Sequence, residues 1–185
     1  MAGITRINIT DDVKGRGAYR FMEARKMQPI ANKLYHQIWE TRGLLLPGDE
    51  QLDCTKNEFY AGYDHALGID VMLTFANGMT ATLQEKFLTT TFYTLTVEYM
   101  QDWRDAIPGD WFNMKCQYYF VGYYNKKDRD AGFTRWVMVN WPSLQVRSDV
   151  VWNERQNTKD GARASFRYIG FNDIPKDCVV AADGC

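Results

Sequence analysis

The sequence predicts an α/β protein with an α+β arrangement, in which one central mixed β-sheet is flanked by helices. Two patterns predict it: an amphipathic helical repeat early in the chain, and a series of segments rich in Val, Ile, Thr, Tyr, Phe and Trp through the middle. At 185 residues and 45% hydrophobic content, the chain is long enough for one well-packed core and short for two. No repeat, low-complexity stretch or linker interrupts it, so we expect residues 1–185 to form a single domain.

The helix is the first element that the sequence predicts. Its apolar residues recur at steps of three and four, which places them on one helical face: Met27, Ile30, Ala31, Leu34, Tyr35, Ile38 and Trp39. Pro29 suits a first helical turn, and Gly43 suits the position after the last one. We therefore expect a helix from about Gln28 to Thr41.

Strands follow the loop at 47–49. The expected ranges are 69–75, 79–88, 92–100, 116–124 and 133–141, then a helix near 149–157 and a strand near 164–171. Asn77-Gly78 predicts a tight hairpin turn with positive φ at both central residues, which would pair residues whose numbers sum to about 155.

Composition limits the function classes. With 22 basic and 23 acidic residues, bulk charge excludes a protein that coats nucleic acid by net charge alone, although local basic patches remain open. No apolar run is long enough to span a membrane and no secretory signal opens the chain, so we expect a soluble, cytoplasmic protein. Four cysteines without a CxxC pair and two histidines support neither a structural zinc site nor a disulfide framework; a Cys178–Cys185 bridge is disfavoured in a reducing compartment.

The hairpin brings three polar residues together. Alternation along 79–88 puts Gln84 and Lys86 on one face and Glu85 on the other, and the expected register sets Asp70 opposite about Glu85, next to both. A carboxylate and an amide oxygen suit Mg²⁺ or Mn²⁺, and a lysine beside them could orient a water or stabilise charge on a phosphate. An ordinary salt bridge on a sheet surface is the competing interpretation.

These residues resemble the PD-(D/E)XK nuclease superfamily, which has the restriction-endonuclease-like fold. Asp70 matches the family's aspartate, Gln84 its D/E position and Lys86 its lysine, over a layout that covers roughly residues 20–100. The longer string YDHALGIDVMLTFANGMTATLQEKF is similar to phage and Holliday-junction-type members. The resemblance implies a metal-dependent DNA nuclease with Asp70, Gln84 and Lys86 as catalytic residues and Asp70 and Gln84 as metal ligands. If the chain is phage-encoded, it implies the host cytoplasm as its location.

The match departs from the pattern at two positions. Gln84 replaces the usual acid and removes one negative charge from the metal site, so a catalytically inactive relative stays open. Ile69, not proline, precedes Asp70.

Auxiliary residues are suggested as well. Asp64 could supply a second carboxylate and His65 could assist with a phosphate, or the pair could belong to a turn before the strand. Glu23 matches loosely the family's helix glutamate, or pairs with a neighbouring cation at helical spacing. Glu98 in the third strand could face the site or solvent.

Two further features bear on nucleic acid. Lys126, Lys127 and Arg129 form a local basic stretch that could contact DNA, single-stranded or branched. Aromatic residues crowd the strand at 116–124, where they could stack on bases or simply pack the sheet. The alternative to a nuclease is therefore a non-catalytic nucleic-acid-binding or assembly protein on the same fold. Nucleases of this fold often act as dimers, so the resemblance is compatible with a homodimer.

Overall fold

The fold was analysed in a computed structural model, which describes residues 4–6, 26–47, 67–89, 91–158 and 161–183. The elements along the chain are β1 (Ile4–Arg6), α2 (Gln28–Glu40), β2 (Val71–Thr74), β3 (Thr80–Leu88), β4 (Thr94–Asp102), β5 (Ile107–Pro108), α4 (Asp110–Asn113), β6 (Tyr118–Asn125), β7 (Asp128–Asn140), α5 (Trp141–Gln145), β8 (Asn153–Gln156), β9 (Ser165–Gly170), the 3₁₀ turns η3 (Phe171–Asp173) and η4 (Lys176–Cys178), and β10 (Val179–Ala182). The predicted class is confirmed, since a mixed sheet is flanked by helices.

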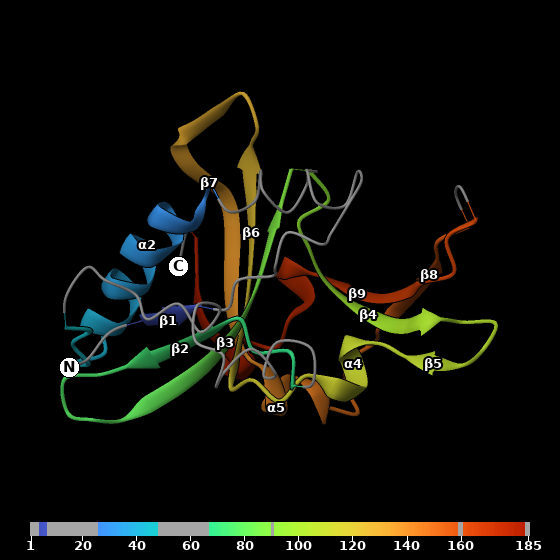
Figure 1. The fold of residues 1–185 in the computed structure, drawn as a ribbon, viewed down its shortest axis with the longest axis horizontal. Helices are drawn as coiled ribbons and strands as arrows, with labels where there is room; N and C mark the ends of the chain where they lie inside the picture. Colours follow the sequence, from blue (N-terminus) through green and yellow to red (C-terminus); the bar gives the residue numbers. More distant parts are fainter. Residues whose placement is uncertain (1–3, 7–25, 48–66, 90, 159–160, 184–185) are drawn as a thin grey trace.

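The main sheet has six strands in the order β1-β2-β3-β6-β7-β10. Strands β3 and β6 run parallel, with Leu83 opposite Tyr118 and Leu88 opposite Tyr123, and every other neighbouring pair is antiparallel. Helix α2 lies beside this sheet, α5 lies below it in the view of Figure 1, and α4 lies next to β4 and β5.

The sequence did not predict a second sheet. Strands β5-β4-β9-β8 form a separate antiparallel sheet, the right-hand lobe in Figure 1, so the segments expected at 92–100 and 164–171 are strands that leave the main sheet. The helix expected at 149–157 is wrong. Residues 153–156 are strand β8, because pairing with β9 satisfies their backbone, and the Glu154–Arg167 ion pair lies across the same two strands.

Helix α2 confirms its prediction almost residue for residue. It begins at Gln28 with Pro29 in the first turn, and Gly43 adopts a left-handed φ of 72° just past its end. Its apolar face packs on one side of the main sheet against residues that alternate along the strands, including Val71, Leu73, Ala81, Leu83, Phe120 and Met138. Burial of this face, not helix propensity, accounts for most of the helix's stability.

The opposite side of the main sheet packs on the second sheet. Tyr119, Val121 and Tyr123 of β6 share a core with Leu95 and Val97 of β4. Trp111, Trp141 and Trp152 join it through edge-to-face ring contacts. The main sheet is thus a middle layer, with α2 on one face and the second sheet on the other, and side chains on β3 must face one or the other.

Candidate functional site

The hairpin register decides which residues meet at the site. The β2–β3 ladder pairs Val71 with Leu83 and Thr74 with Thr80, so residue numbers sum to 154, one less than expected. The turn is also different from the prediction: among the described non-glycine residues only Tyr93 and Ala106 have positive φ, so Gly78 (φ 82°) is left-handed and Asn77 is not. Asn77 instead accepts the Met79 amide on its side chain. The ladder ends at the Val71–Leu83 pair, and Asp70 continues beside β3 through hydrogen bonds with Leu83 and Glu85.

Asp70 lies where β2 begins and acts on the backbone of β3. Its Oδ2 accepts the Glu85 amide at 2.7 Å, while its own amide donates to the Leu83 carbonyl at 3.0 Å. The carboxylate therefore takes the place that a strand carbonyl would otherwise fill. Asp70 stays partly exposed, so it lies at the rim of the sheet core.

The predicted division of β3 into two faces is confirmed. Glu85 points to α2, where its carboxylate accepts from Gln28 Nε2 at 2.7 and 2.9 Å and from Tyr35 Oη at 2.7 Å. Gln84 and Lys86 belong to the opposite face, toward the second sheet. Glu85 is a structural carboxylate and is correctly left out of the shared site.

Of the two polar residues on that face, Gln84 has the less complete set of hydrogen bonds. Its Oε1 is buried and has no hydrogen-bond partner in the part of the chain that the structure describes. A buried amide oxygen without a donor costs about 1–3 kcal/mol, so a side chain in this position invites a functional explanation. An oxygen of this kind is a suitable ligand for a hard cation.

Lys86 reaches across to the second sheet. Its Nζ donates to the Thr96 carbonyl at 3.2 Å, and it lies 5.8 Å from the centre of the Phe166 ring. Burial lowers the pKa of the Lys86 ammonium below its usual 10.5, although the negative charges of Asp110 and Glu98 act in the opposite direction. The residue is thus a lysine whose charge is destabilised, facing two carboxylates.

Glu98 belongs to this cluster. Burial raises the pKa of its carboxyl above the usual value, and Asp110 raises it further, while Lys86 lowers it. The charges of Glu98, Asp110 and Lys86 therefore influence one another.

Sequence reasoning missed three members of the cluster. Asp110 is the first residue of α4. Tyr119 Oη donates to the Thr96 carbonyl at 2.8 Å, so this carbonyl accepts hydrogen bonds from both Tyr119 and Lys86. The negative charge of Asp110 acts to raise the pKa of Lys86 and that of Tyr119, although burial is the main cause of the raised pKa of Tyr119. Only the docking of the second sheet on β3 and β6 unites these residues, and no local sequence signal marks it.

The prediction that Asp70 and Gln84 hold a metal ion stays a prediction. Across the described ranges no three His, Cys, Asp or Glu side chains gather as a metal-binding group. The Asp70 carboxylate and the Gln84 amide oxygen, which has no partner among the described residues, are hard oxygen donors of the kind that Mg²⁺ takes. The proposed auxiliaries Asp64, His65 and Glu23 lie outside the described residues, as do Cys54 and Cys185; Cys178 is a free, buried thiol.

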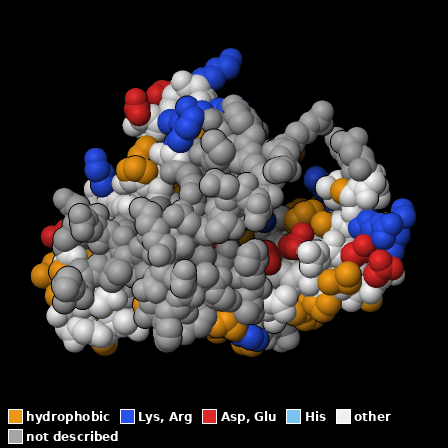
Figure 2. Space-filling view, viewed as in Figure 1, with side chains coloured by type: hydrophobic (Ala, Val, Ile, Leu, Met, Phe, Trp, Pro, Cys, Tyr) orange, Lys and Arg blue, Asp and Glu red, His pale blue; other side chains and the backbone are white. Residues whose placement is uncertain are grey.

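The basic stretch lies at a different place. Lys126 and Lys127 form the turn between β6 and β7 and are exposed, and Arg129 follows in β7. Figure 2 shows basic side chains over this hairpin, at the top of the molecule, with acidic ones beside them. The structure does not bring Lys126, Lys127 and Arg129 to the Lys86 cluster.

The crowded aromatics are mostly core residues. Tyr119, Phe120, Tyr123 and Tyr124 of β6 are buried, so the packing interpretation holds for them. Tyr119 and Tyr123 also donate through their hydroxyls to the exposed edge of β4, at the carbonyls of Thr96 and Thr94. These two hydrogen bonds hold strand β4 of the second sheet next to Lys86.

Comparison with known proteins adds no family. No family model, no curated protein and no solved structure matches the chain. Within the described residues, no helix is both long enough and apolar enough to cross a membrane.

Proposed function

We propose that the chain is a metal-dependent nuclease that hydrolyses DNA phosphodiester bonds at the end of the β2–β3 hairpin. The observation that carries this proposal is the face of β3 where an unpartnered buried amide oxygen of Gln84 adjoins a lysine of lowered pKa. Structural positions rarely keep two such costly groups side by side, whereas catalytic sites do. The resemblance of Asp70, Gln84 and Lys86 to the PD-(D/E)XK pattern supports the same chemistry.

Asp70 and Gln84, with a neighbouring backbone carbonyl, would hold Mg²⁺ or Mn²⁺. When bound, the metal supplies positive charge that polarises a phosphate and lowers the pKa of a water. The Glu85 amide fixes one oxygen of Asp70, so the chain orients the carboxylate before any cation arrives.

Lys86 would act on the attacking water or on the charge that develops at the phosphate. A lysine of lowered pKa gives up its proton more readily than an ordinary lysine, which suits it to take part in proton transfer. Thr96 fixes its ammonium through the carbonyl, and Glu98 and Asp110 keep part of its charge in place.

A non-catalytic nucleic-acid-binding or assembly protein is the second candidate. It is favoured by one observation, that Asp70 and Lys86 each already have a structural partner, the Glu85 amide and the Thr96 carbonyl. In that case Asp70 only links the start of β2 to β3, and Lys86 only links β3 to β4.

Location and assembly follow from the nuclease role. A DNA nuclease of this kind would act in the cytoplasm, that of the host cell if it is phage-encoded. A homodimer would let two sites reach the two strands of a duplex.

The test is cleavage of supercoiled, single-stranded and branched DNA with Mg²⁺ or Mn²⁺. We expect metal-dependent cutting that Lys86→Ala abolishes and that Lys33→Ala, an exposed lysine on α2, leaves intact. Absence of cutting on all three substrates, with DNA binding unchanged in Lys86→Ala, would move the assignment to the non-catalytic candidate.

A further inference from the structure

A cavity lies under the tip of the β6–β7 hairpin, between that hairpin and the start of α2. It has a volume of about 370 Å³ and is lined by Lys26, Ile30, Lys126, Lys127, Asp128, Arg129 and Asp130. Lys26 precedes α2, whereas the other charged residues are about 100 positions later in the chain. The cavity therefore exists only because the fold brings these two segments together.

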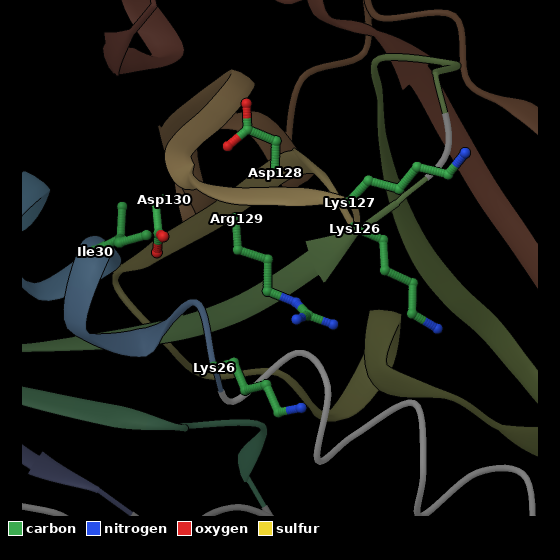
Figure 3. A pocket seen from close by; sticks show the side chains of 7 residues that line it. All are labelled: Lys26, Ile30, Lys126, Lys127, Asp128, Arg129 and Asp130. Atoms are coloured by element: carbon green, nitrogen blue, oxygen red, sulfur yellow. The ribbon is translucent and has the colours of Figure 1, made fainter.

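The cations of this cavity are not arranged evenly. Figure 3 shows Lys26, Lys126 and Arg129 directed into the same space below the hairpin, from two different segments. Lys127 extends to the other side of the turn, and Asp128 points away from that space. Asp130 lies beside Ile30, so it offsets only part of the positive charge.

Helix α2 adds to the positive potential of the cavity. Its thirteen residues begin at Gln28, between the lining residues Lys26 and Ile30, and its first turn carries no acidic residue. The positive end of the helix dipole therefore lies at the cavity edge, where the Glu85 carboxylate bonded to Gln28 offsets part of it. The described lining carries four cationic and two acidic side chains, so its formal charge is positive although the whole chain has a formal net charge of −1.

We propose that this cavity binds one phosphate group of a nucleic-acid strand, held by Lys26, Lys126 and Arg129. Arginine offers a planar fork of donors to phosphate oxygens and the lysines add point charges, which together suit an anion that is small and multiply hydrogen-bonded. The proposal rests on nucleic acid as the substrate class of the proposed function, but it does not depend on hydrolysis. The phosphate is either a strand-terminal monoester or an internal diester, which share this chemistry.

Binding of a single strand in EDTA tests the proposal without cleavage. The probe is a single-stranded DNA of about 16 nucleotides, labelled with fluorescein at its 3′ end and carrying either a 5′-phosphate or a 5′-hydroxyl. Anisotropy is measured at several salt concentrations. We expect Lys26→Gln and Arg129→Gln each to weaken binding about threefold to tenfold and to reduce the salt slope by about one.

Lys33→Gln is the control, since it removes the same charge from an exposed side chain of α2 that does not line the cavity. We expect it to change affinity by less than about twofold. A loss confined to the 5′-phosphorylated strand assigns a terminal phosphate, and equal losses on both strands assign an internal one. Equal effects of Lys33→Gln and Lys26→Gln, or no effect of Lys26→Gln and Arg129→Gln, would overturn the proposal.

The proposed nuclease can fail independently of this site. Lys86 lines no part of the cavity, so the substitutions at Lys26 and Arg129 leave the proposed catalytic lysine in place. A protein that binds the strand through Lys26 and Arg129 but cuts no DNA would retain the phosphate site and lose the catalytic assignment.

Discussion

The two faces of strand β3 differ in how well their polar groups are satisfied. On the α2 face, Glu85 receives hydrogen bonds from Gln28 and Tyr35, so a half-buried carboxylate is matched by donors. On the other face, Gln84 Oε1 lacks a partner among the described residues, and burial depresses the pKa of Lys86. Adjacent residues of one strand thus lie in opposite electrostatic situations.

This difference distinguishes polar side chains that stabilise the fold from polar side chains that could serve function. A buried group with its hydrogen bonds made contributes to a unique fold, whereas a group left short of partners costs stability and is retained where chemistry uses it. We therefore assign Glu85 to the fold and Gln84 and Lys86 to the site. Each of the following substitutions tests one side of that assignment.

Removal of Glu85 should have the largest effect on stability. Glu85→Ala leaves the Gln28 amide and the Tyr35 hydroxyl without their acceptor, so we expect the free energy of unfolding to fall by about 2–4 kcal/mol. Urea denaturation measures it. Glu154→Ala, which breaks the exposed pair with Arg167, is the control and should cost less than about 1 kcal/mol. Equal losses in the two variants would contradict a structural role for Glu85.

Substitution of Gly78 in the β2–β3 turn should lower the stability of the hairpin without favouring either face of β3. A Cβ at Gly78 meets nothing within 4 Å, so Gly78→Ala costs only the strain of its φ of 82°, about 1–2 kcal/mol of unfolding free energy. Gly78→Asn should lose less, because asparagine tolerates that conformation better. DNA cleavage should be unchanged in both variants, and a variant that loses cleavage while remaining folded would show that the turn takes part in function.

Gln84 should be replaceable without loss of stability. Gln84→Leu removes a buried oxygen that lacks a donor and keeps a similar volume, so we expect the free energy of unfolding to rise by up to about 1 kcal/mol. The same variant should bind Mn²⁺ more weakly, which calorimetric titration measures. A destabilised Gln84→Leu protein would show that the amide has a structural partner after all.

The lowered pKa of Lys86 predicts a small pH dependence. Between its pKa in the fold and its usual value of 10.5, the unfolded chain binds more protons at this residue than the folded one, so the free energy of unfolding rises with pH. Methionine binds no proton, so Lys86→Met lacks this contribution to the pH dependence of stability. The wild type should therefore gain stability relative to Lys86→Met as the pH rises toward 10.5, and a constant difference would contradict the depressed pKa.

The sequence predicted the elements that local patterns specify. Helix α2 follows from its apolar spacing with Pro29 and Gly43 at its ends, and the opposite orientations of Glu85 and Lys86 follow from strand alternation. The register was wrong by one residue, because a turn with Gly78 alone left-handed lengthens the loop.

The second sheet could not be predicted in the same way. Strand β8 has a polar sequence that reads equally well as helix, and only its pairing with β9 decides between the two. Glu98 was recognised as a candidate but not oriented, and Asp110 was not recognised, because both depend on how β4 docks against Lys86. Long-range packing, not local propensity, completes the candidate site.

The most direct test of the two-face assignment is a paired measurement on Lys86→Met, which replaces the ammonium with an apolar side chain of similar length. Cleavage of DNA with Mg²⁺ and the free energy of unfolding are determined on the same preparation. We expect cleavage to fall by about 100-fold or more while stability is equal to or above that of the wild type, because Tyr119 still donates to the Thr96 carbonyl. Retained cleavage, or a marked loss of stability, would contradict the assignment of Lys86 to the site.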